Sequence, residues 1–389
     1  MTARTPVVVG GVVGWALALA PGQLPHPALL TAAVGTVLML VGMGVGGCCA
    51  LVAGRRRPIT RRMLLCSAAV SVLLVVASHR WQVRVADGIG VAAPGPEWIA
   101  ASAGIPLAVA AAVAVVPGRV WAVGAVVAAL IGAPAARAHA AEPDVPADPA
   151  ITYSRLDRSS DVDARARDLV ARWARKPATS AVVVIVPTGS GWVDTSAVTG
   201  FEERFHGDVA FVAMQYSAVP SWQAYLTSPD AATDSAIAVV RALDQRLRTL
   251  PTRPDVYVFG QSLGAIGADA ARGWADRAGV RLTGTVLSGP PAGTVEPLPD
   301  CARRTVLANA TDPVVDADAS LLWRPPTRDV TTIGAPRAAA PWIPGVSFVG
   351  TALDLAVSLD GPVGTGHHYG VEQGLAAAPC QAIGPRAAS

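Results

Sequence analysis

The residues best suited to chemistry lie in the string Gly260-Gln261-Ser262-Leu263-Gly264. A serine flanked by glycines, directly after an apolar strand and before an Ala-rich helix, is typical of a nucleophile elbow. The glycines allow the sharp turn that exposes the hydroxyl, and the helix N-terminus favours negative charge that develops beside it. The string predicts Ser262 as a nucleophile. An ordinary glycine-bounded turn between a strand and a helix is the alternative.

A nucleophilic serine needs a base, and in this arrangement the base follows the serine and the acid in the chain. His367 and His368 are the only histidines after Ser262. They lie in a glycine-bounded loop, so one of them is the expected base, and a surface loop is the alternative interpretation.

The acid that orients the base is expected after a strand that lies between these points. Asp312 meets this condition, because it follows an apolar strand predicted at 304–308. Asp316 and Asp318 are nearby alternatives. A turn aspartate before proline would also explain Asp312.

Two backbone N–H groups have to bind the oxyanion that forms when a serine attacks a carbonyl. One is expected from Leu263, directly after the nucleophile, and the other from Thr188 or Gly189 in the glycine-rich loop that follows a strand at 181–186. A phosphate-binding loop is the alternative for this stretch. That alternative is disfavoured because the loop lacks the Gly-Lys-Ser/Thr ending.

The elements that must hold these residues alternate between strand and helix. Continuous apolar runs predict strands at 181–186 and 209–214, and further strands are expected at 255–259, 283–287 and 304–308. Helices are expected at 160–175, 231–248 and 263–277. Such alternation implies an α/β fold with a mostly parallel sheet and helices on both faces.

The first third of the chain has a different composition. The whole chain is 52% hydrophobic and 15% charged, whereas soluble proteins carry about 25% charged residues. Uninterrupted apolar stretches predict a bundle of about five transmembrane helices, at 6–21, 28–53, 63–78, 98–116 and 120–135. A cluster of buried core helices, or a cleaved signal peptide over 1–21, are the alternatives.

Charge suggests an orientation for these helices. The loop 55–62 holds five arginines and is expected in the cytoplasm by the positive-inside rule. With five crossings, everything after 135 lies outside; if 120–135 does not cross, the soluble part is cytoplasmic. The net charge of +3 is too small to indicate nucleic-acid binding.

Three parts follow: a transmembrane domain over 1–136, a linker rich in Pro, Ala and Asp over 137–151, and a catalytic domain over 152–389. Cys301 and Cys380 are the two cysteines of the last part. They could form a disulfide or remain two free buried thiols.

Longer strings carry a resemblance to a known family. They are Pro187-Thr-Gly-Ser-Gly-Trp-Val-Asp194, Met214-Gln-Tyr-Ser217, Pro220-Ser-Trp222, Tyr257-Val-Phe-Gly-Gln-Ser-Leu-Gly264, Asp312-Pro-Val-Val315, Leu321-Leu-Trp-Arg324 and Gly366-His367. Residues 180–370 resemble the actinobacterial membrane-anchored α/β-hydrolase family of unknown physiological role, which joins N-terminal transmembrane helices to a hydrolase domain.

The resemblance implies a triad of Ser262, Asp312 and His367, with His368 as the alternative base. The chain departs from the family pattern at Gln261, where glutamate is expected, and at 316–317, where aromatic residues are expected. These departures concern the choice of substrate more than catalysis.

The expected function is therefore that of a membrane-tethered serine hydrolase of the extracytoplasmic face. It would act on an ester or thioester of a small-molecule or lipid acyl substrate, through an acyl-enzyme and without metal or cofactor. The alternatives are an acyltransferase with the same triad and a non-catalytic hydrolase fold that serves as a binding module in an envelope complex. Trp192, Trp222, Trp323 and Trp342 could line an acyl pocket or pack in the core.

Overall fold

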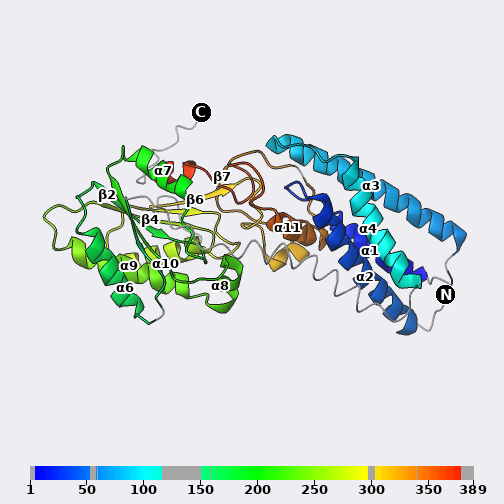
Figure 1. Cartoon of the computed structure of the whole chain (residues 1–389), viewed down its shortest axis with the longest axis horizontal. Helices are drawn as coiled ribbons and strands as arrows, with labels where there is room; N and C mark the ends of the chain where they lie inside the picture. The colour runs from blue at the N-terminus through cyan, green and yellow to red at the C-terminus, as the bar shows by residue number, and fades with distance from the viewer. Residues whose placement is uncertain are drawn as a thin grey trace, which may run out of the picture. The chain divides into compact units, whose positions relative to one another are not determined.

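A computed structural model describes residues 5–52, 58, 60–115, 150–157, 159–296, 303–338 and 340–377. The chain divides into two compact units (Figure 1). The helical unit comprises Met1–Ala140, Ala317–Pro326 and Ala335–Gly366, and the sheet unit comprises Ala141–Asp316, Thr327–Gly334 and His367–Ser389. Cys301, Cys380 and the apolar stretch 120–135 lie outside the described residues.

The N-terminal helices of the helical unit are α1 (Thr5–Ala18), α2 (Ala28–Val52), α3 (Arg61–Ile89) and α4 (Pro96–Val115). In the described part, three of them are long and apolar enough to cross a membrane: Ala28–Val52, Arg61–Ile89 and Pro96–Val113. The expectation of five spans is corrected to three here. Helix α1 has only 14 residues, about 21 Å at 1.5 Å per residue, which is too short for a hydrocarbon core of about 30 Å.

Glycines bring α1 and α2 into close contact. A Cβ atom on Gly10 would lie 2.2 Å from the carbonyl oxygen of Gly42, and one on Gly42 would lie 2.0 Å from that of Gly10. Small residues at such crossings let two backbones approach, as in helix pairs within lipid. Trp15 of α1 and Trp98 of α4 are buried, and their indole N–H groups bond to backbone carbonyls, so these large rings leave no indole N–H unpaired.

The helical unit also contains two later segments, η1 (Ala319–Leu322) and α11 (Val346–Ala356). The expected boundary near 137–151 therefore does not describe the compact units by itself, because residues 317–326 and 335–366 belong with the N-terminal helices.

Asp354 of α11 joins this later segment to the loop between α1 and α2. Its carboxylate, 2% exposed, accepts the backbone N–H groups of Gln23 at 2.7 Å and Leu24 at 3.1 Å, and it lies 2.8 Å from His26 Nε2. Gln82 of α3 holds the other side of the ring, with its amide 3.3 Å from His26 Nδ1. Because an amide N–H can only donate, Nδ1 accepts and Nε2–H donates to Asp354.

A parallel sheet forms the centre of the sheet unit. Its strands are β1 (Ile151–Ser154), β2 (Ala181–Val186), β3 (Val209–Met214), β4 (Asp255–Gln261), β5 (Gly284–Ser288), β6 (Arg304–Asn309) and β7 (Thr331–Ile333). They lie in the order β1-β3-β2-β4-β5-β6-β7, and all neighbouring pairs are parallel. The carboxyl ends of all seven strands therefore meet at one edge, where ligands bind in open α/β sheets.

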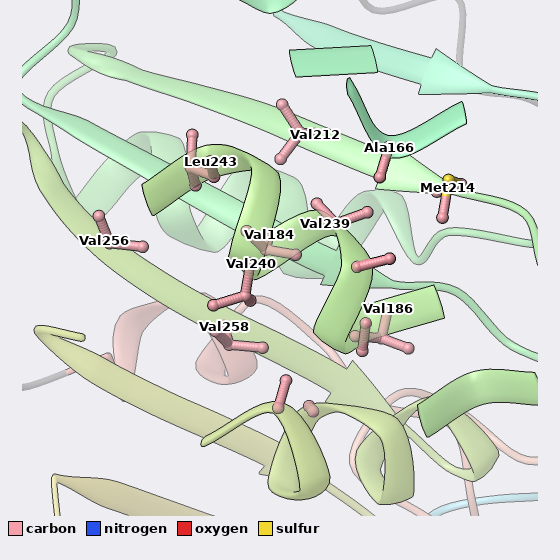
Figure 2. Packing of buried hydrophobic residues seen from close by; sticks show 14 of the residues in the cluster. Ala166, Val184, Val186, Val212, Met214, Val239, Val240, Leu243, Val256 and Val258 are labelled. Carbon is pink, nitrogen blue, oxygen red and sulfur yellow. The ribbon is translucent and has the colours of Figure 1, made fainter. Parts of the chain in front are cut away.

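Helices cover both faces of this sheet (Figure 1). The helices of the sheet unit are α6 (Val162–Trp173), α7 (Thr195–Arg204), α8 (Ser221–Thr227), α9 (Ala231–Leu247), α10 (Leu263–Ala278) and α12 (Glu372–Leu375). Side chains of α6, α9 and α10 pack on one face against Val184, Met214 and Val258 (Figure 2). Side chains of α7 pack on the other face against Val183 and Phe211.

Successive side chains of β2 point alternately into these two cores, which explains why the strand has no polar residue. All six residues of β2 are buried, because both faces are covered. The five predicted strands are confirmed as β2 to β6. The short edge strands β1 and β7 were not predicted, since each has four residues or fewer and no apolar run.

Candidate active site

The elbow predicted around Ser262 joins the central strand β4 to α10. Ser262 is half-buried and has φ 55° and ψ −124°, a conformation that non-glycine residues rarely adopt. Two close backbone approaches require glycine on either side. A Cβ on Gly260 would lie 2.2 Å from the carbonyl oxygen of Gly264, and one on Gly264 would lie 2.2 Å from that of Val186. The strained serine is thus fixed by the turn itself.

A buried histidine–aspartate pair lies at the same edge of the sheet. His367 Nδ1 is 2.8 Å from Asp312 Oδ2, and the two side chains are 9% and 0% exposed. Asp312 follows β6, and Val314 N–H donates to its Oδ1 at 2.8 Å. The same Oδ2 also accepts the hydroxyl proton of Tyr369, which is itself buried.

Contacts through β5 bring this pair close to the elbow. Ser262 N–H donates to the Ser288 carbonyl at 2.9 Å, and Gln261 Nε2 is 3.5 Å from the His367 carbonyl. A Cβ on Gly289, the next residue after Ser288, would lie 2.6 Å from His367 Cε1. Among the described residues, His367 Nε2 has no hydrogen-bond partner. The imidazole ring is anchored through Nδ1, so Nε2 can form a hydrogen bond with another group.

The alternatives to these residues have other roles. Asp316 makes a two-pronged ion pair with Arg328, with both distances 2.7 Å. Asp318 caps η1 through its bond to Ser320 N–H at 2.8 Å. The His368 carbonyl accepts the Asn309 side chain at 3.0 Å, and the ring bonded to Asp312 is that of His367.

Arg328 fixes the loop that carries Asp312. Besides its pair with Asp316, the guanidinium donates to the carbonyls of Asn309 at 3.2 Å, Ala310 at 2.9 Å and Asp312 at 3.0 Å. All five N–H groups of the guanidinium thereby donate hydrogen bonds, whereas a lysine ammonium has only three. The charge of Arg328 is neutralised by Asp316 rather than by Asp312.

The loop expected to complete the oxyanion hole lies against the start of α10, as the closeness of Val186 and Gly264 shows. Both of its predicted donors already have acceptors in this structure. Thr188 N–H donates to the Trp192 carbonyl at 3.0 Å, and Gly189 N–H donates to Ser221 Oγ at 3.0 Å. Leu263 is the first residue of α10, whose N–H has no acceptor within the helix.

Side chains from two strands hold this loop in place. Tyr153 of β1 donates its hydroxyl to the Gly191 carbonyl at 2.7 Å, and Gln215, after β3, donates to the Ser190 carbonyl at 3.0 Å. Of the aromatic residues considered for an acyl pocket, Trp192 and Trp222 of the sheet unit are both exposed. Trp323 is exposed in the helical unit, where Trp342 donates its indole N–H to the Leu321 carbonyl at 3.1 Å.

Sequence reasoning did not single out Tyr369, Arg328 or Ser221. Tyr369 stands two residues after His367, and a buried tyrosine needs a partner for its hydroxyl, so its position was a usable signal. Arg328 lies 16 residues after Asp312 and Ser221 lies 32 residues after Gly189, and no local pattern links either pair.

The arrangement combines a half-buried serine in a sharp turn, an imidazole whose Nε2 has no partner among the described residues, and a buried carboxylate. Such a set can activate a hydroxyl for attack on a carbonyl. Within the residues that the structure describes, no group of three or more His, Cys, Asp or Glu side chains is placed to hold a metal ion.

Comparison with known proteins agrees with this architecture. The sequence pattern of the alpha/beta-hydrolase family matches residues 151–296 and 296–378, which together are more than half of the 389 residues. No curated protein matches the chain. The matched region contains the elbow, the loop after β2 and the His367–Asp312 pair, and the chain belongs to the alpha/beta-hydrolase family.

Proposed function

We propose that the protein is a serine hydrolase that cleaves an ester or thioester through an acyl-enzyme, with Ser262, His367 and Asp312 as its triad. The observation that carries the proposal is the state of His367, whose Nδ1 is held by a buried carboxylate and whose Nε2 has no partner among the described residues. It lies beside an elbow in which the serine has the strained backbone of a nucleophile.

In the proposed reaction, Ser262 Oγ forms a bond to the substrate carbonyl carbon while its proton passes to His367 Nε2. The carbonyl π electrons move to the oxygen, which becomes an oxyanion. The C–O or C–S bond to the leaving group then breaks, and the leaving group takes the proton from Nε2. Water repeats these steps on the acyl-enzyme and releases the acid, while Asp312 stabilises the imidazolium each time.

The proposed oxyanion hole uses the N–H of Leu263 and that of Gly189. Gly189 N–H becomes available when Ser221 Oγ turns away by rotation about a single bond, which its half-buried position permits. Thr188 N–H is a weaker candidate, because its acceptor is a backbone carbonyl in the same tight loop.

We propose further that the catalytic domain is tethered to a membrane, which the three candidate spans support. The five arginines of 55–62 follow α2 in the sequence or begin α3, so the end of α2 and the start of α3 mark the arginine-rich end of these helices. Thr5, at the start of α1, is at that end too, since its hydroxyl lies 3.3 Å from the Pro58 carbonyl. By the positive-inside rule this end is cytoplasmic.

The contact of residues 335–366 with the N-terminal helices supports an extracytoplasmic catalytic domain. Asp354 binds the loop between α1 and α2, which is at the opposite end of these helices from the arginines. Helix α4 begins at this outer end, where Trp98 bonds to His26, and runs back to the cytoplasmic end. We therefore propose that the hydrolase domain lies on the outer side; residues 116–149, between α4 and β1, are outside the described part of the chain.

Labelling with a membrane-impermeant fluorophosphonate tests both parts of the proposal. Wild type, Ser262→Ala and the control Ser160→Ala, at an exposed serine outside the site, are compared in intact cells and in opened membranes. We expect labelling of intact cells by wild type and by the control, and none by Ser262→Ala.

Two other results would change the conclusion. Labelling only after the membranes are opened would keep the hydrolase and place the domain in the cytoplasm. Folded wild type that is labelled in neither preparation would contradict the proposed enzyme and favour a binding module. Product analysis with added alcohols separates hydrolysis from acyl transfer, because both reactions use the same triad.

A further inference from the structure

Tyr369 makes a contact that the reaction described above does not use. Its hydroxyl donates to Asp312 Oδ2, the oxygen that also faces His367 Nδ1. Among the described residues, the hydroxyl oxygen also accepts the Asn309 N–H, at 3.4 Å. Because an N–H can only donate, the phenol proton has to point to Asp312.

This phenol is a permanent donor. Tyr369 is 1% exposed, and burial together with the neighbouring Asp312 carboxylate raises the pKa of its hydroxyl well above the usual value. The hydroxyl therefore keeps its proton over the whole range in which a histidine titrates.

The three groups converge over one glycine. A Cβ on Gly289 would lie 2.6 Å from Tyr369 Oη, 2.6 Å from His367 Cε1 and 2.7 Å from Asp312 Oδ2. The tyrosine and imidazole rings meet edge to face, with centroids 5.5 Å apart and planes at 85°. The phenol thus restrains the position of the carboxylate and the rotation of the imidazole together.

We propose that Tyr369 is a positioning residue that shares the negative charge of Asp312 with His367 and so limits how strongly the carboxylate holds the imidazolium. This inference rests on the proposed hydrolase function. Among the described residues, the charged and titratable side chains around the pair are Tyr369, which bonds to Asp312 Oδ2, and Arg328 with its partner Asp316. Arg328 binds Asp316 and the Asp312 carbonyl, so Tyr369 is the side chain that modulates the carboxylate.

The variant Tyr369→Phe tests this role and keeps the ring contact. Without the phenol, more of the carboxylate charge acts on the imidazolium, so His367 keeps its proton to higher pH. We expect the acid limb of the fluorophosphonate reaction to move to higher pH, and the rate at pH 7 to fall about tenfold, as expected for one hydrogen bond to a charged group. Tyr216→Phe, at a buried hydroxyl without a partner among the described residues, should change neither.

A second readout does not depend on activity. Nuclear magnetic resonance of 15N-histidine in the full chain follows the titration of His367 directly, with His367→Gln to assign its signals. The midpoint should lie at higher pH in Tyr369→Phe than in wild type. Should that variant not fold, 3-fluorotyrosine in place of Tyr369 gives a stronger donor, and the midpoint should move to lower pH instead.

The outcomes separate the two hypotheses. An unchanged His367 midpoint in the folded variants, or a loss of rate that is equal at every pH, would overturn the role of Tyr369. Wild type that never reacts with the fluorophosphonate, while the midpoint still shifts, would contradict the proposed hydrolase and leave the Tyr369 contact established.

Discussion

Ser262 owes its conformation to residues that have no room for a side chain. At Gly264, a Cβ would lie 2.2 Å from the Val186 carbonyl oxygen and 2.8 Å from that of Pro187. Both obstacles are backbone atoms at the end of β2, where the loop with Thr188 and Gly189 begins. A methyl group at this position must push α10 away from the loop.

Gly264→Ala is therefore expected to reduce the rate of fluorophosphonate labelling more than tenfold, because a displacement near 1 Å misplaces both the proposed nucleophile Ser262 and the Leu263 N–H. The matched control is Gly273→Ala in the same helix. Its Cβ would meet only the end of the Arg277 side chain, at 3.4 Å. It should keep full labelling and gain up to about 1 kcal/mol in the free energy of unfolding.

Labelling rates at fixed probe concentration and thermal unfolding curves measure both effects. Gly264→Ala that reacts within twofold of wild type would show that the loop after β2 yields easily. It would also show that close packing at Gly264 does not position the proposed oxyanion donors.

At the scale of the elements, Asp194 links two helices on one face of the sheet. It caps α7 by accepting Ser196 N–H at 2.9 Å, and Gln373 of α12 donates its amide to the other carboxylate oxygen at 2.8 Å. Burial raises the pKa of Asp194, since these bonds do not fully replace water. The folded protein consequently holds this proton to higher pH than the unfolded chain does.

Asp194→Asn should remove this pH dependence. In wild type the contribution of Asp194 is fully present below the unfolded pKa of about 3.9 and is lost as pH rises through the raised folded pKa. The amide keeps the cap, and Gln373 Oε1, which has no partner among the described residues, can accept its N–H after a flip. The Tm difference, Asn variant minus wild type, should increase between about pH 4 and pH 7.

Asp161→Asn is the matched control, because Asp161 caps α6 from an exposed position. Its Tm difference from wild type should not grow with pH. A constant difference for Asp194→Asn as well would show that Asp194 ionises in the folded protein as easily as in the unfolded chain.

Local sequence predicted the elements best where a strand is buried on both faces. The runs at 181–186 and 209–214 agree with β2 and β3 to the residue. The elbow was predictable because one strand, one turn and one helix are consecutive. The contacts of Ser221 with Gly189 and of Arg328 with Asp312 were not, since they depend on how loops from different strands meet at the sheet edge.

The number of candidate membrane spans was also only partly predictable from local sequence. Apolar length predicted α2, α3 and α4, while it also counted α1, a helix of 14 residues. Composition could not show that residues 335–366 pack with these helices, because the carboxylate that joins them lies in a mixed-polarity stretch of the hydrolase region.

At the scale of the whole molecule, Asp354 is a buried side chain that joins two distant stretches of the helical unit. Asp354→Ala would leave the N–H groups of Gln23 and Leu24 and the ring of His26 without their acceptor. Loss of a buried acceptor for three donors should cost about 2–5 kcal/mol of unfolding free energy. Limited proteolysis should then cut within 335–366 faster than in wild type.

Asp360→Ala, at an exposed position a few residues later, is the control and should leave the cutting rate unchanged. Equal protection of Asp354→Ala and wild type would mean that apolar packing of α11 suffices to hold the segment.

The bond between Gln23 and Asp354 spans 331 positions of the chain. A ribosome that adds about 5–20 residues per second needs roughly 17–66 s to cover that stretch. During this time the loop after α1 has been synthesised, but its acceptor does not yet exist. The helical unit can therefore form this contact only after residues 335–366 have been synthesised, long after the loop that they hold.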